Sequence, residues 1–318
     1  MTRRSRKLRT ELAYGEPVDT AQLLIDVLGP VVFIVAAGAF AGPRLGLDTE
    51  TLSKLAYWVL GLAFIFDIFS TTNLPADTAI KLVAAGAAGL VVAGLVARAL
   101  APAAGLRGPA ASATVMSSAF GNVGNAGLAI SVFALGDDAL DRAGVLMLTI
   151  LFLGTLLSVW LGTRQRESSI RAAARAVASP MIAAGIVGFI VNVFDLALPV
   201  LVERSASTIA QGLIPVMLFT LGLQLATTGN LRFMRSTAVV TIAKLIVAPL
   251  VGWAVAEAFG LTGDDRGVII LQSAMPPAVF CMVMAIEHDL EAERTTNDVV
   301  VVTVLSLITL PVALTLLS

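Results

Sequence analysis

The chain has 318 residues, of which 57% are hydrophobic and only 14% are charged, and its mean hydropathy is +0.91. A soluble domain averages roughly 45–50% apolar and about 25% charged residues, so this composition excludes an ordinary soluble protein and indicates a helical membrane protein. The formal net charge of −1 gives no reason to expect nucleic acid as a partner. A single cysteine, Cys281, excludes an intrachain disulfide and a cysteine metal cluster, and no metal or other cofactor is expected.

Apolar runs long enough to cross a bilayer recur along the chain, since a membrane-spanning helix needs about 20 mostly apolar residues. After a basic N-terminal tail over residues 1–20, which we interpret as uncleaved, the sequence predicts ten spans. These lie near residues 22–42, 52–71, 79–101, 111–135, 143–163, 180–201, 207–228, 236–259, 266–288 and 296–317. The chain therefore divides into a first five-helix unit (21–163), a basic connecting loop (164–179) and a second five-helix unit (180–318).

The two units match each other at a constant offset of 155 residues. Gly105-Leu106-Arg107-Gly108 aligns with Gly260-Leu261-Thr262-Gly263, and Ser118-Ala119 aligns with Ser273-Ala274. Because each unit contains five spans, an odd number, the second unit must lie upside down relative to the first. Inverted repeats are a common architecture of secondary transporters, which bind substrate near the membrane midplane at interrupted helices. The sequence therefore predicts an all-α transporter of ten helices in two inverted repeats.

Basic residues in the loops predict the orientation in the membrane. Loops on the N-terminal side carry few of them, whereas the opposite side carries many more, including four arginines in the connecting loop. The positive-inside rule places the connecting loop in the cytoplasm and both termini outside the cell (inner) membrane, although the basic tail favours the reverse.

Two spans contain residues that interrupt a helix. The fourth span has three glycines and two asparagines within Gly121–Gly127, and the ninth has two consecutive prolines. Backbone groups freed at such breaks must face protein or a water-lined cavity rather than lipid. We expect the two breaks to cross at the centre, with helix N-termini and free amides facing an anion; the alternative is ordinary kinks at packing seams. The predicted substrate-binding residues are Gly121, Asn122, Asn125, Gln272, Ser273, Pro276 and Pro277.

Ionisable residues in or near the spans are costly there and are candidates for coupling or gating. Lys244, the most deeply placed charge, either attracts a carboxylate or extends its stem towards the interface. Asp67, near the end of the second span, either receives a coupling proton or cation or reaches the interface. Asp77 and Lys81 are spaced i to i+4 at the start of the third span, so they can face each other as a surface pair.

Several segments have patterns typical of one transporter family, namely Gly121–Leu128 (GNVGNAGL), Ile214–Gly222 (IPVMLFTLG), Ala274–Pro276 and Thr303–Pro311 (TVLSLITLP). Over nearly its whole length after the tail, the chain resembles the auxin efflux carrier family, which includes plant PIN proteins and bacterial carriers of malonate or malate. The resemblance implies ten helices with the fourth and ninth crossed, transport of organic carboxylates, and a homodimer. Plant relatives carry a similar Asp-x-x-x-Lys before the third helix, which implies a gating or coupling role for Asp77 and Lys81.

The sequence departs from the plant pattern at two positions. Gly121 stands where plant members tend to carry proline, and Leu60, the repeat mate of Pro215, is not a proline. The chain also has no large central hydrophilic loop. These departures leave the identity of the transported acid open while the transporter interpretation stands.

We therefore interpret the chain as an alternating-access carrier of a small organic carboxylate, with proton or sodium coupling left open. The alternative is a sodium-coupled organic anion symporter of the bile-acid-symporter type, which has a related architecture but requires a sodium site. A channel or a membrane receptor is a further alternative that flux kinetics would separate. An enzyme is not expected, because one histidine cannot supply a His-Glu-x-x-His zinc site and no Gly-x-Ser-x-Gly motif occurs.

Overall fold

The computed structural model describes residues 20–163, 180–227, 231–287 and 290–315. Within these ranges the regular structure is helical, and the β structure consists of one isolated bridge between Gly121 and Pro277. The all-α class is therefore confirmed. The predicted basic tail and connecting loop lie outside the described residues, apart from Thr20, where the first helix begins.

The first half of the chain opens with a long helix and a second long helix that contains a π-helical turn. Its elements are α2 (Thr20–Arg44), α3 (Thr49–Leu55), the π-helical turn η1 (Ala56–Leu60), α4 (Gly61–Thr71), α5 (Ala76–Leu100), α6 (Gly108–Ala119), the π-helical turn η2 (Val123–Gly127), α7 (Leu128–Leu135) and α8 (Ala139–Thr163). Elements α3, η1 and α4 run on without interruption, whereas α6 and η2 are separated by three residues.

The described second half has a similar succession of helices, but its π-helical turn falls at a different place. It comprises α10 (Pro180–Val193), α11 (Val200–Gln211), α12 (Leu213–Thr227), α13 (Arg235–Thr241), the π-helical turn η3 (Ile242–Val247), α14 (Ala248–Ala258), α15 (Gly263–Ser273), α16 (Phe280–Glu287) and α17 (Ala292–Thr315). Here α15 and α16 are the separated pair, with six residues between them.

Seven helical segments of the described chain are long and apolar enough to cross a membrane. The predicted fourth and ninth spans are absent from this set because each is broken into two short helices, and α10 begins at the edge of the described residues. Large apolar side chains such as Phe33, Leu201 and Ile308 are exposed on the surface, as lipid-facing residues are. These features indicate a multi-pass membrane protein; the count of ten spans stays a prediction.

The predicted boundary between the sixth and seventh spans was wrong. The sixth span was expected to continue to residue 201, but α10 ends at Val193 and α11 already begins at Val200. The intervening segment, Phe194–Pro199, is mostly apolar, so hydropathy does not mark it as a loop. The backbone conformation shows that this segment is a loop, because Asp195 has a positive φ of 48° and Pro199 immediately precedes α11.

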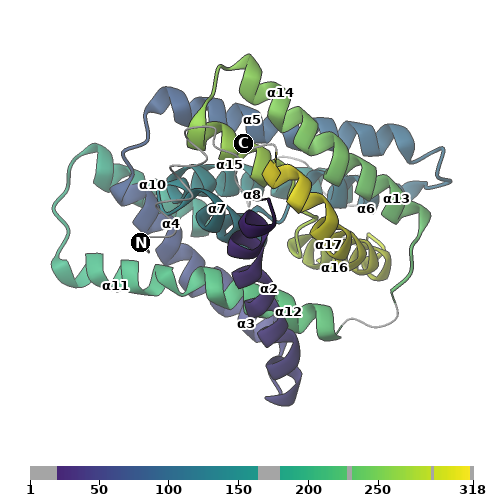
Figure 1. Cartoon of the computed structure of the whole chain (residues 1–318), viewed down its shortest axis with the longest axis horizontal. Coiled ribbons are helices and arrows are strands. Elements are labelled where there is room, and N and C mark those ends of the chain that lie inside the picture. The colour runs from purple at the N-terminus through teal and green to yellow at the C-terminus, as the bar shows by residue number, and fades with distance from the viewer. Residues whose placement is uncertain (1–19, 164–179, 228–230, 288–289, 316–318) are drawn as a thin grey trace.

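Helices from the two halves pack against each other in a reciprocal pattern (Figure 1). Helix α2, the first of its half, packs on α12, while α10, the first of the second half, packs on α4. Helix α14 lies against α5 and α15 at the top of the view. Each half thus completes the other, so neither half buries its helices alone.

Two turns in the structure follow the internal repeat. Gly105 and Gly108 have positive φ angles of 75° and 54°, and Gly260 and Gly263 have positive φ angles of 64° and 56°. The left-handed region of φ strongly favours glycine, so the same backbone path leads into α6 and into α15. These matched turns agree with the 155-residue offset; how the two halves are inverted in a membrane stays a prediction.

Candidate functional site

The two helix breaks lie side by side and are joined by main-chain hydrogen bonds. The N–H of Asn122 donates to the carbonyl of Pro276 at 2.7 Å, and the N–H of Ala278 donates to the carbonyl of Phe120 at 2.8 Å. Between them, Gly121 and Pro277 form the isolated antiparallel bridge. We call these two segments, 120–122 and 275–278, the helix crossing. The structure thus brings four of the predicted binding residues together: Gly121, Asn122, Pro276 and Pro277.

The local sequence explains why the helices stop here. Asn122 caps the second half-helix of the fourth span, since its Oδ1 accepts the N–H of Asn125 at 3.2 Å. On the other side, Pro276 and Pro277 have no N–H to continue the helical ladder of α15. The half-helices η2–α7 and α16 therefore begin at or just after the crossing, and their N-termini carry partial positive charge.

Polar side-chain atoms without partners are buried close to these breaks. Asn122 and Gln272 are each only 3% exposed, yet Asn122 Nδ2 and Gln272 Oε1 have no hydrogen-bond partner in the described part of the chain, and neither has Ser117 Oγ. The other end of the Gln272 amide donates to Ser131 Oγ at 3.3 Å. Leaving a buried polar group unpaired costs about 1–3 kcal/mol, so such groups are expected where a ligand completes them.

Lys244 extends into the crossing from η3. Its side chain is 4% exposed, and a Cβ added at Gly121 would lie 2.7 Å from its Nζ and 3.0 Å from its Cε. The interpretation that Lys244 extends to the membrane interface was therefore wrong. This contact also explains why glycine stands at position 121, because any larger side chain there would displace the lysine amine.

Two of the predicted binding residues contribute less to the crossing. Ser273, the last residue of α15, lies on the side of that helix that faces α14 and α5. A Cβ added at Gly252 of α14 would lie 2.8 Å from the Ser273 Cβ, and Gly89 of α5 also faces the Ser273 hydroxyl. Asn125 is half-buried in η2, where its main-chain N–H is already bound to Asn122. A role for Ser273 in substrate contact therefore has no support in this geometry.

The predicted pair of Asp77 and Lys81 forms at the start of α5. Its charged atoms are 3.6 Å apart, and the side chains are 69% and 38% exposed, respectively. An exposed pair of this kind contributes at most about 1 kcal/mol to stability. Its gating or coupling role stays a prediction.

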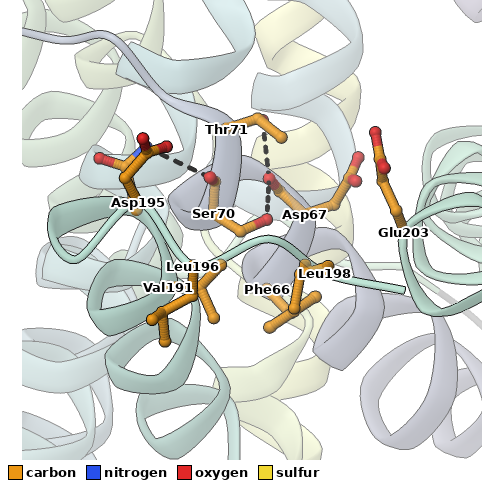
Figure 2. A pocket seen from close by; sticks show the side chains of 10 residues that line it. Phe66, Asp67, Ser70, Thr71, Val191, Asp195, Leu196, Leu198 and Glu203 are labelled. Carbon is orange, nitrogen blue, oxygen red and sulfur yellow. Dashed lines mark hydrogen bonds between the residues drawn. The ribbon is translucent and has the colours of Figure 1, made fainter. Parts of the chain in front are cut away.

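Asp67 lies in a separate cavity of about 190 Å³ at the ends of α4 and α10 and the start of α11 (Figure 2). The cavity is lined by the carboxylates of Asp67, Asp195 and Glu203, and Asp67 and Glu203 face each other across it. The hydroxyls of Ser70 and Thr71 donate to the main-chain carbonyl of Asp67 and leave its carboxylate free of those bonds. Among the described residues, no group of three or more His, Cys, Asp and Glu side chains is arranged to hold a metal ion.

Sequence reasoning missed Asp298, a carboxylate on α17 that is 1% exposed. Its Oδ1 accepts hydrogen bonds from Ser236 Oγ at 3.1 Å and from Thr237 Oγ1 at 2.6 Å, both in the first turn of α13. An acidic residue directly before a run of four valines, within the predicted tenth span, was the available signal. Because these bonds tie the N-terminus of α13 to α17, we assign Asp298 a structural role.

Comparison with known proteins agrees with the transporter interpretation. A family model described as membrane transport protein matches residues 163–314. An uncharacterized transporter of Methanocaldococcus jannaschii is 23% identical over 198 residues, which cover 61% of this chain and 64% of that protein. An uncharacterized transporter of Methanothermobacter thermautotrophicus is 27% identical over 200 residues, which cover 62% of this chain and 65% of that protein. The aligned part of the chain thus spans just under two thirds of these relatives, and the resemblance to a transporter family is confirmed.

Proposed function

We propose that this chain, which is similar to transporters of the auxin efflux carrier family, is an alternating-access carrier of a small organic carboxylate in the cell membrane. The observation that carries the proposal is the helix crossing, where breaks from the two halves of the chain bond to each other beside unpartnered buried polar atoms. Interrupted helices at the interface of two repeats are the usual substrate site of secondary transporters.

The chemistry of the crossing favours a negatively charged substrate. The N-termini of two half-helices lie at or near it, Asn122 Nδ2 is an unpaired donor, and Lys244 brings a positive charge. Each of these groups stabilises an anion that has lost its hydration shell. In this proposal the carboxylate lies between Asn122, Asn125 and the backbone around Pro276 and Pro277, and Gln272 contacts its polar part.

The transport cycle in this proposal uses the two halves as two inverted five-helix repeats, which rock against each other around the crossing. Both termini lie outside and the connecting loop lies in the cytoplasm, and two copies form a homodimer. An anion leaving a negatively charged cytoplasm is driven outward by about 2.3 kcal/mol per charge per 100 mV, so export needs no coupling ion. Import would need proton or sodium coupling, for which Asp67 is the candidate residue, with Asp77 and Lys81 as the candidate gate.

The first test is thermal stabilisation of the purified protein by a panel of acids (malonate, malate and indole-3-acetate), each with and without sodium. A ligand that binds only the folded state at 100 times its Kd stabilises by about 2.7 kcal/mol. Asn122→Ala should remain folded and lose this stabilisation, because it removes the unpaired donor. Asn73→Ala changes an exposed asparagine and serves as the matched control.

The outcomes separate the candidate functions. Stabilisation by one acid that disappears in Asn122→Ala, followed by saturable counterflow of that acid in proteoliposomes, supports the carrier. Stabilisation that requires sodium favours the symporter of the bile-acid type. Wild-type binding and flux in Asn122→Ala would contradict the assignment of the site to the crossing.

A further inference from the structure

We propose that the ammonium group of Lys244 is the counter-ion of the substrate carboxylate, so that substrate binding needs no sodium ion. This inference rests on the proposed function and deepens it, because it names the residue that selects the charge of the substrate.

The first argument is that Lys244 is buried without a carboxylate partner. Its side chain is 4% exposed, and none of the carboxylates in the described ranges forms an ion pair with it. The Cys281 thiol, also buried, is close enough to interact with it electrostatically but is normally a neutral group. A buried charge without a partner is strongly unfavourable, so an anionic ligand that pairs with the Lys244 ammonium relieves this cost when it binds.

The other described lysines, which are more exposed, each have a carboxylate partner. Lys54 pairs with Glu50 at 2.5 Å, and Lys81 pairs with Asp77 at 3.6 Å; each partner precedes its lysine by four residues on the same helix. At Lys244 the residues four positions before and after are Val240 and Ala248. No helical neighbour at this spacing can neutralise Lys244, and its amine instead lies against Gly121 in the helix crossing.

The second argument is that an unpaired hydrogen-bond donor, Asn122 Nδ2, lies on the residue next to the one that the Lys244 amine contacts. Gly121, which the lysine amine contacts, directly precedes Asn122, whose Nδ2 is unpaired and whose side chain is 3% exposed. A carboxylate has two oxygens and accepts from both a cation and an amide donor. Lys244 also lies in η3, and π-helical turns inside α-helices frequently mark functional sites. A cation that lies against Gly121 and a donor on the next residue, Asn122, suit one carboxylate group.

A fixed cation removes the electrostatic reason for a bound metal cation. In a sodium-coupled symporter the sodium ion offsets the negative charge that the substrate brings into the membrane. Here the lysine ammonium supplies that charge from within the chain. The affinity for a carboxylate substrate is therefore expected to be the same in a sodium salt as in the salt of a large organic cation.

The experiment measures the affinities of the full-length protein for acids and for their neutral amides. The probes are malonate against malonamide and indole-3-acetate against indole-3-acetamide, in sodium chloride and in N-methylglucamine chloride. Wild type, Lys244→Met, Lys244→Arg and the matched control Lys54→Met are compared. Because truncating one partner of a buried charge pair is costly, Lys244→Met should lose about 30-fold or more of its affinity for the acid. Its affinity for the amide should change little, and Lys54→Met should behave as wild type.

The preference for acid over amide is the decisive quantity, because a general loss of packing would weaken both ligands alike. A Lys244→Met protein that keeps this preference overturns the inference, and so does wild-type binding that requires sodium. If Lys244→Met does not fold, Lys244→Arg decides, since it should keep the preference with altered affinity. If wild type binds no acid, the proposed function fails as well; if only Asn122→Ala loses binding and Lys244→Met does not, the function stands and this inference falls.

Discussion

Among the places where helix backbones approach closely in the described structure, the contact of α2 with α12 and the helix crossing differ most clearly. In the first, the helices are intact at the point of contact. Gly38 lies against the carbonyl of Phe219, and Gly222 lies against the carbonyl of Val35. In the second, the helices are broken, and their main chains exchange hydrogen bonds between Asn122 and Pro276.

The two contacts differ in whether buried polar groups beside them lack hydrogen-bond partners. Small residues let membrane helices approach closely without a break in either helix at the point of contact, so the contact of α2 with α12 is packing. The crossing has an unpaired side-chain atom on Asn122, and beside it lie an unpaired atom of Gln272 and the amine of Lys244, which has no carboxylate partner among the described residues. Close approach alone therefore indicates stability, whereas close approach with unsatisfied polar groups indicates a binding site.

The largest expected effect is on the packing contact. In Gly38→Ala the new Cβ would overlap the carbonyl of Phe219, and backbone cannot move aside as a flexible side chain does. We expect a loss of about 3 kcal/mol of stability, the upper end for overpacking. Gly29→Ala, on the same helix, is the matched control, since a Cβ there meets no atom within 4 Å. Thermal unfolding in detergent measures both, and Gly29→Ala should be neutral or stabilising by up to about 1 kcal/mol.

Carboxylate affinity should remain near wild type in any folded fraction of Gly38→Ala. Equal stability of the two alanine variants would show that α2 and α12 do not approach as described. The α2–α12 contact could then no longer serve as the example of close packing without unpaired polar groups.

A smaller effect is expected on binding at the crossing. In Gly121→Ala the new methyl group displaces the Lys244 amine, which can move because it ends a flexible side chain. The protein should stay folded and lose about tenfold in affinity for the acid, or about 1.4 kcal/mol. Gly124→Ala, three residues further on, is the matched control, because its Cβ would meet Met147 and Met217 only at 3.6 Å or more.

A double-mutant cycle sharpens this prediction. If Gly121→Ala acts through the lysine, it should have little further effect on affinity once Lys244 is replaced by alanine. Additive losses would mean that Gly121 affects binding by another route.

Sequence patterns predicted the parts of the fold that depend on local chemistry. Hydropathy located the spans, and the glycine–asparagine and proline clusters located both breaks, because these residues disrupt helices wherever they occur. The missing proline at Leu60 was less informative: the structure has the π-helical turn η1 at Ala56–Leu60, and the second half has a matching irregularity at Gly212 between α11 and α12. The turn between α10 and α11 was missed because its residues are mostly apolar.

The direction of side chains around the crossing could not be predicted. From the sequence, the Lys244 side chain could point either to a substrate carboxylate or to the membrane interface. Only its position against Gly121 on the facing segment decides between the two. Asp298 was missed because its partners, Ser236 and Thr237, lie about 60 residues away along the chain. Such contacts depend on tertiary packing, which periodicity and local propensity do not encode.

The smallest expected effect separates Ser273 from its neighbour Gln272. Both were predicted to bind substrate, but the Ser273 side chain packs towards Gly252 and Gly89, whereas the unpaired oxygen of Gln272 is buried beside Gly127 of the broken fourth span. Ser273→Ala should therefore change acid affinity by less than about threefold, because removing a hydroxyl outside the site costs no substrate contact. Gln272→Leu should lower it more. Affinity measurements on both variants check this, and a large loss in Ser273→Ala without a change in thermal stability would mean that substrate reaches the α14 side of α15 as well.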